Sequence, residues 1–245
     1  MRTSSRYSDL VWAVVAFAQL ACGDGGPAPP LPSPSGPPVC PLPAEDPRPA
    51  ELSLWYPTAL VRLSDGTARC WGGNGKAQCT VTEFTGQWFW PGYANRIACA
   101  TSLAVGSFGG IATYADGAVR GWSALPEILA PTEDPDAEPG LPTRVNGLDG
   151  AKSVTAGEQV AFAIREDDVA VWWGAFPYNP VAVATEPTPV PGLPPVKQIS
   201  MGTHACAVTL GGEVWCWGRN SAGQPGDGTP LDRLEAKPVI GVQNA

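Results

Sequence analysis

The feature that most constrains this chain is a twelve-residue segment that occurs four times and always ends in tryptophan. The four copies are Leu60–Trp71, Ile111–Trp122, Phe162–Trp173 and Cys206–Trp217. The terminal Trp recurs after 51, 51 and 44 residues. Spacing of this size is the signature of an architecture built from stacked repeats.

Each copy has the pattern of a β-hairpin. Apolar and polar residues alternate on both arms, and a turn residue that tolerates positive φ lies five positions before the Trp. The residues in this turn position are Gly66, Gly117, Asp168 and Gly212. The constant place of the Trp favours packing between repeat units over a platform for stacking sugars.

Two shorter strand patterns precede the later hairpins. Pro142–Leu148 is followed by Ser153–Gly157, and Pro189–Leu193 is followed by Ile199–Gly202. Two strands and a hairpin give four strands in about 50 residues, which is the size of a propeller blade. The 29 Gly and 28 Pro, together with ten Trp, agree with many short strands. The fold class is therefore expected to be all-β.

The fourth repeat resembles the repeat of the regulator of chromosome condensation family. The resemblance rests on Cys206–Gly218, followed by Asn220–Gln224 and Gly226–Thr229. The first repeat keeps Trp71-Gly72, Asn74 and Gln78, whereas the second and third lack the Asn-x-x-Gly-Gln stretch. The resemblance extends from Glu51 to the C-terminus. It implies a β-propeller of about four repeats, although family members usually form a ring of seven blades.

Two arrangements of four repeats are open. In a small closed ring, Val239–Val242 would pair with the sheet that contains Leu52–Leu63, because closure removes exposed sheet edges. In the alternative, the repeats form an open arc, a fragment of a larger ring that dimerises or stays partly disordered.

The N-terminus is typical of an export signal. Leu10–Ala21 is an apolar run too short to span a bilayer, and Leu20-Ala21-Cys22 resembles the cleavage site of a lipoprotein. We therefore expect a signal peptide at 1–22 with Cys22 as the lipidation site, a proline-rich spacer at 23–50 and a repeat domain at 51–245. Simple secretion and a buried N-terminal helix are the alternatives.

Six cysteines remain once Cys22 is set aside, and an even number in an exported chain indicates disulfides. Cys206 and Cys216 face each other across a hairpin, so we expect them to be bonded. In the first repeat Leu60 occupies the partner position of Cys70, which leaves Cys79 as the nearest candidate. The pairing of Cys40 and Cys99 is open.

Few residues could support catalysis or bind a cofactor. The one histidine, His204, lies in a repeat position, and no second cluster completes a metal site with Cys206. Asp65, Asp116 and Asp167 lack the alternating oxygen ligands of a calcium loop. No catalytic residue, metal or cofactor is therefore expected. The net charge of −8 also argues against a nucleic-acid partner.

We therefore expect an exported scaffold, either a membrane-anchored lipoprotein or extracellular, that binds an unknown protein through its blade loops. Its contact with a membrane would be through the lipid only. Trp88, Trp90 and Tyr93 are the candidate partner-binding residues, because aromatic side chains are enriched at binding hot spots. Trp88 and Trp90 could instead form a buried strand face. The alternative functions are a hydrolase or lyase with a site in the central channel, and a factor for guanine-nucleotide exchange.

Overall fold

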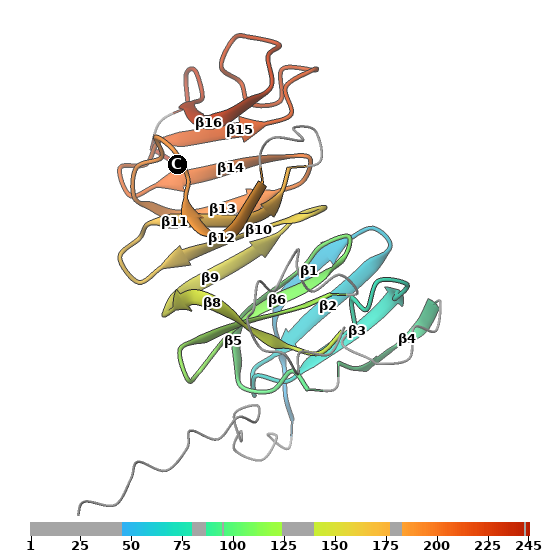
Figure 1. The fold of residues 1–245 in the computed structure, drawn as a ribbon. Helices are drawn as coiled ribbons and strands as arrows, with labels where there is room; N and C mark the ends of the chain where they lie inside the picture. The colour runs from blue at the N-terminus through green and yellow to red at the C-terminus, as the bar shows by residue number, and fades with distance from the viewer. Residues whose placement is uncertain (1–45, 80–86, 95, 124–139, 177–182, 243) are drawn as a thin grey trace, which may run out of the picture. The chain divides into compact units, whose positions relative to one another are not determined.

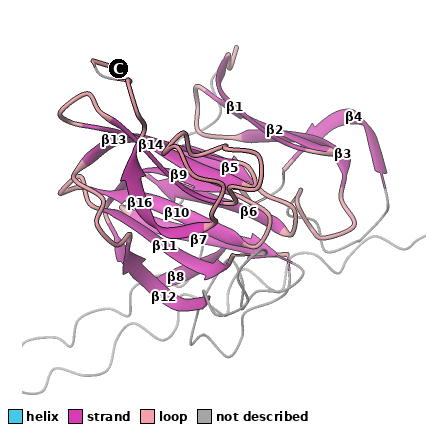
Figure 2. Ribbon diagram, turned by 90° about the horizontal axis from the view of Figure 1, so that it is seen from above, coloured by secondary structure: helices cyan, strands magenta, loops and turns pink. Residues whose placement is uncertain are grey.

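The computed structural model describes residues 46–79, 87–94, 96–123, 140–176, 183–242 and 244–245. Figures 1 and 2 show that these ranges form β-strands and loops without a helix, so the all-β prediction is confirmed. Accordingly, no helix in the described ranges could cross a membrane. The expected signal peptide, its Cys22 and most of the spacer lie outside the described residues.

The strands form four antiparallel sheets, and each sheet is one continuous stretch of sequence (Figure 1). The first sheet contains β1 (Pro49–Trp55), β2 (Thr58–Leu63), β3 (Ala68–Gly73) and β4 (Gln87–Tyr93). The second contains β5 (Ala100–Val105), β6 (Gly109–Tyr114), β7 (Ala118–Ser123) and β8 (Thr143–Asp149). The third contains β9 (Ala151–Ala156), β10 (Val160–Arg165), β11 (Ala170–Ala175) and β12 (Val183–Pro189). The fourth contains β13 (Val196–Met201), β14 (His204–Thr209), β15 (Val214–Gly218) and β16 (Arg233–Pro238).

The four predicted hairpins are the two central strands of each sheet. They are β2–β3, β6–β7, β10–β11 and β14–β15. The turn residue has a positive φ in every hairpin, at 79° for Gly66 and Gly117, 65° for Asp168 and 81° for Gly212. The sequence-based choice of turn was therefore correct at all four places.

The boundaries between sheets differ from the expected repeat unit. Pro142–Leu148 and Ser153–Gly157 were expected in the same unit, but β8 is the outer strand of the second sheet and β9 begins the third. Gly150, whose φ is 70°, lies in the turn that leads from one sheet to the next. The strand pattern alone predicts that both segments are extended, but it does not identify their neighbours.

The closed-ring prediction is wrong. Val239–Val242 lies outside the strands, and the amide of Val239 donates to the carbonyl of Val214 in its own sheet. The physical reason is that β4 already supplies the fourth strand of the first sheet, so no strand position is vacant there. The described sheets thus form an incomplete propeller.

Apolar side chains fill the three joints between successive sheets. The first joint contains Leu60 and Cys70 from the first sheet and Leu103, Val105 and Trp122 from the second. The second and third joints contain Trp173 and Trp217 in the corresponding place. Each of these three Trp side chains is 0–1% exposed, so they pack between sheets as the repeat predicted, whereas Trp71, the fourth, is only half-buried.

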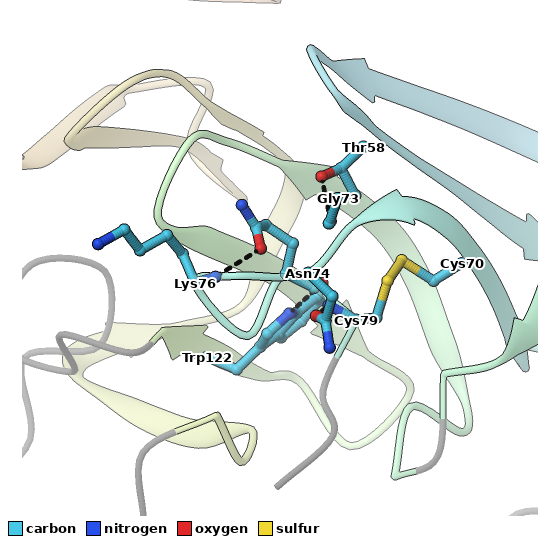
Figure 3. The surroundings of a disulfide bond; sticks show 8 residues. Thr58, Cys70, Gly73, Asn74, Lys76, Cys79 and Trp122 are labelled. Carbon is cyan, nitrogen blue, oxygen red and sulfur yellow. Dashed lines mark hydrogen bonds between the residues drawn. A yellow bond between two sulfur atoms is a disulfide. The ribbon is translucent and has the colours of Figure 1, made fainter. Parts of the chain in front are cut away.

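A polar contact accompanies the apolar packing in the first joint (Figure 3). The indole Nε1 of Trp122 donates to the backbone carbonyl of Gln78 at 2.9 Å. The Gln78 side chain donates to the carbonyl of Ser107, also at 2.9 Å. Gly110 makes room for the indole, because a Cβ atom there would lie 2.4 Å from the ring. The loop after β3 is therefore fixed to the second sheet by two hydrogen bonds.

Replacing Trp122 by Phe should lower the free energy of unfolding by about 2–4 kcal/mol. The change leaves a small cavity and a buried carbonyl without its donor. Trp215→Phe is the matched control, since the Trp215 indole donates to Glu213 of its own sheet in an exposed position. Chemical denaturation measures both variants. Equal losses of unfolding free energy in the two variants would show that the Trp122–Gln78 hydrogen bond between the sheets adds no stability of its own.

Candidate protein-interaction surface

The aspartates of the hairpin turns have a structural role. A carboxylate oxygen of each accepts the backbone amide two residues later: Asp65 from Thr67 at 3.0 Å, Asp116 from Ala118 at 3.0 Å and Asp167 from Val169 at 3.3 Å. Such Asx bonds close tight turns. The pKa of Asp116 is lowered, chiefly because Arg120 donates a hydrogen bond to it, and desolvation only partly opposes this. These three turns are thus ordered by their own aspartates.

Two loops that follow the third strand of a sheet have the same conformation. In Asn74–Gln78 the amide of Lys76 donates to the Gln78 Oε1 at 2.9 Å. In Asn220–Gln224 the amide of Ala222 donates to the Gln224 Oε1 at 2.8 Å. The fourth position of each loop has positive φ, 59° at Ala77 and 76° at Gly223. We call these segments the first and fourth lock loops.

Strand β4, the outer strand of the first sheet, contains the candidate aromatic residues. The backbone of Trp88 pairs with Gly72, and Trp90 lies in the same strand. Only Tyr93 has a described side chain. It is 57% exposed, and the Arg69 guanidinium lies 3.3 Å from its ring centroid. Tyr93 and Arg69 therefore form an exposed cation–π pair at the rim of the sheet.

Sequence reasoning missed a second exposed feature, on β1, the opposite edge strand of the same sheet. Leu52 and Leu54 of β1 are 59% and 65% exposed. Their neighbours Glu51 and Ser53 point the other way and accept the amides of Leu103 and Val105 in the second sheet. The alternation in β1 could have revealed two faces, but it could not show which face would lack a covering sheet.

Both expected cysteine pairs are disulfides in the structure. Cys206 and Cys216 are register partners with their Cα atoms 4.1 Å apart. Cys70 and Cys79 have a Cα separation of 5.5 Å, and this bond ties the first lock loop to β3 (Figure 3). Cys99 is disulfide-bonded as well.

The described residues hold no cluster of three or more His, Cys, Asp or Glu side chains that could bind a metal. His204 is half-buried at the start of β14, and its Nδ1 is buried without a hydrogen-bond partner. Cys206, the nearest candidate ligand in sequence, is bonded to Cys216. The acidic residues Glu133, Asp134, Asp136 and Glu138 lie outside the described residues.

Comparison with known proteins identifies the repeat. The model of the regulator of chromosome condensation (RCC1) repeat matches residues 196–224. This segment spans β13, the β14–β15 hairpin and the fourth lock loop. This chain contains an RCC1 repeat.

Relatives of this RCC1-repeat chain share part of its length. Protein pim1 of Schizosaccharomyces pombe is 32% identical over 153 residues, which cover 52% of this chain and 28% of pim1. The ultraviolet-B receptor UVR8 of Arabidopsis thaliana is 38% identical over 104 residues, covering 38% of this chain and 24% of UVR8. The chain thus spans about a quarter of these relatives.

Solved structures show the same fold. Human WBSCR16 superimposes with a TM-score of 0.66 at 18% identity, covering 78% of this chain and 52% of WBSCR16. Yeast RCC1 (Prp20), solved bound to Kap60, gives a TM-score of 0.63 at 17% identity, covering 77% of this chain and 48% of Prp20. The chain therefore spans about half of each of these structures.

The Cys70–Cys79 disulfide should stabilise the first lock loop. We expect the double variant Cys70→Ser/Cys79→Ser to lose about 2–3 kcal/mol of unfolding free energy, because a closed loop of this size restricts the unfolded chain. Denaturation under non-reducing conditions measures the loss. Adding reductant to the unmodified chain should lower its stability further, since it also opens the other disulfides. An unchanged double variant would contradict this role.

Proposed function

We propose that this RCC1-repeat chain is an exported, non-catalytic scaffold that binds a protein partner. The observation that carries the proposal is the fold: four ordered sheets that present their turns at the sheet ends. Such loops are free to form an interaction surface. Prp20, which has the same fold, was solved in complex with the protein Kap60.

The cysteine chemistry supports export. Disulfides form and persist mainly in oxidising compartments, and the described residues include the bonded pairs Cys70–Cys79 and Cys206–Cys216. The apolar run at Leu10–Ala21 and the adjacent Cys22 add a signal for lipid attachment. The proposed location is therefore a membrane surface outside the cytosol, reached through the lipid.

Replacing Cys22 by Ser should abolish incorporation of a fatty-acid label. Cells that express each variant are labelled with an alkyne analogue of palmitate, and the purified chain is analysed on a gel. Cys40→Ser, which changes another N-terminal cysteine, should keep the label. Equal labelling of the unmodified chain and the Cys22 variant would exclude this anchor.

Tyr93 and its Arg69 neighbour are the proposed centre of the partner site. The immobilised full chain should capture a partner from the envelope or the medium, and mass spectrometry identifies it. Replacing a hot-spot aromatic typically costs about 2 kcal/mol or more, so Tyr93→Ala should weaken this binding by at least roughly 30-fold. Leu231→Ala, a change at another exposed side chain, should have no effect. Equal weakening by both variants would remove Tyr93 from the site.

A further inference from the structure

The first joint shows what a face of a sheet looks like when another sheet covers it. On the second sheet, the side chains that contact the first sheet are Leu103, Val105, Ala112 and Trp122. None of them is more than 2% exposed. These positions are thus the apolar centre of a joint.

The first sheet carries similar residues at the same positions, 51 residues earlier. They are Leu52, Leu54, Val61 and Trp71, which we call the incoming face. The strand registers agree, since Leu52 pairs with Val61 as Leu103 pairs with Ala112. Leu52 and Leu54 are 59% and 65% exposed, whereas Leu103 and Val105 are 2% and 1% exposed. The incoming face thus has the composition of a covered joint surface but lies open.

The fourth sheet is open on its other face, the one that a following sheet would cover. In the third sheet, Phe162, Ile164 and Ala170 are buried against the fourth sheet. The same register positions 44 residues later hold Cys206, Val208 and Val214, all partly exposed. Burial in β14 alternates along the strand, whereas all six residues of β6 are buried. Together with Gln224, these three residues form what we call the outgoing face.

The fourth lock loop lies beside the outgoing face in the conformation of the first lock loop. In the first joint, the Gln78 side chain donates a hydrogen bond to the Ser107 carbonyl of the next sheet. The Gln78 carbonyl accepts one from the Trp122 indole of that sheet. Gln224 is held by Ala222 in the same way and is half-buried. Within the described residues, no fifth sheet follows to use its amide and carbonyl. An indole equivalent to that of Trp71 would fit against the fourth lock loop in the way that the Trp122 indole fits against the first lock loop.

We propose that a second copy of this chain covers both open faces, with the incoming face of each copy packed on the outgoing face of the other. The Trp71 indole then donates to the Gln224 carbonyl of the second copy. This inference goes beyond the proposed function, because it concerns sheet faces and the chain itself rather than a foreign partner.

Two observations favour a second copy as the occupant. Each open face is the complement of the other, so one docking mode covers both, and the ring closes after two copies when four sheets span half of it. The chain also spans 52% and 48% of the two solved propellers, so two copies supply the length of one. Eight sheets lie within the usual range for closed propellers.

The proposed partner site remains accessible in this assembly. Tyr93 is the register partner of Arg69 in the first sheet, and Arg144 is the register partner of Arg120 in the second sheet. Arg144 is therefore the equivalent of Tyr93. The Arg144 side chain is 57% exposed although its sheet takes part in a joint. The Tyr93 position therefore lies outside the joint, and Tyr93→Ala should leave the oligomeric state unchanged.

Sedimentation of the full chain at micromolar concentration tests the proposal. The unmodified chain should have twice the mass of one chain. Leu54→Asp blocks the incoming face and Val208→Asp blocks the outgoing face. Each alone should raise the dissociation constant at least about 100-fold, because a carboxylate would be buried in an apolar joint. Leu210→Asp, at a 57% exposed turn position, is the control and should remain dimeric.

Mixing the two blocked variants makes the test specific. Each keeps the face that the other has lost, so an equal mixture of Leu54→Asp and Val208→Asp should form a dimer with a single joint. This rescue also shows that both variants are folded. A monomeric unmodified chain, a single variant that stays dimeric, a mixture that stays monomeric, or a ladder of larger species would each overturn the two-copy ring.

Discussion

Packing of a tryptophan from one sheet against the preceding sheet is the interaction on which the arrangement of sheets depends. Trp122, Trp173 and Trp217 occupy this place and are almost fully buried. A single four-stranded sheet has two apolar faces and cannot bury both by itself. The indole supplies a large apolar surface, and in the first joint its N–H also satisfies the carbonyl of Gln78. Apolar burial and hydrogen bonding thus stabilise the same joint.

The hairpins could be predicted because their causes are local. A residue that accepts positive φ, placed between alternating arms, specifies the turn and the register at Gly66, Gly117, Asp168 and Gly212. The Cys206–Cys216 pairing followed from the same register. These features need no knowledge of distant parts of the chain.

Sheet membership and exposure could not be predicted, because they depend on contacts between distant segments. The strand pattern of Val239–Val242 suggested ring closure, yet β4 already completes the first sheet. Leu52 and Leu103 are both leucines at matching positions, but only Leu103 has a sheet packed over it. Tyr93 was named as a binding candidate for its chemistry, and its pairing with Arg69 required coordinates.

Because each sheet is one continuous stretch of sequence, a chain of this kind can gain or lose whole sheets during evolution. Since no strand is exchanged between distant sheets in the described residues, a cut near Gly150 separates whole sheets without breaking a ladder of backbone hydrogen bonds. Duplication or loss of about 50 residues would add or remove one complete module and alter only the number of joints. The number of blades in such a protein is therefore open to simple gene rearrangement.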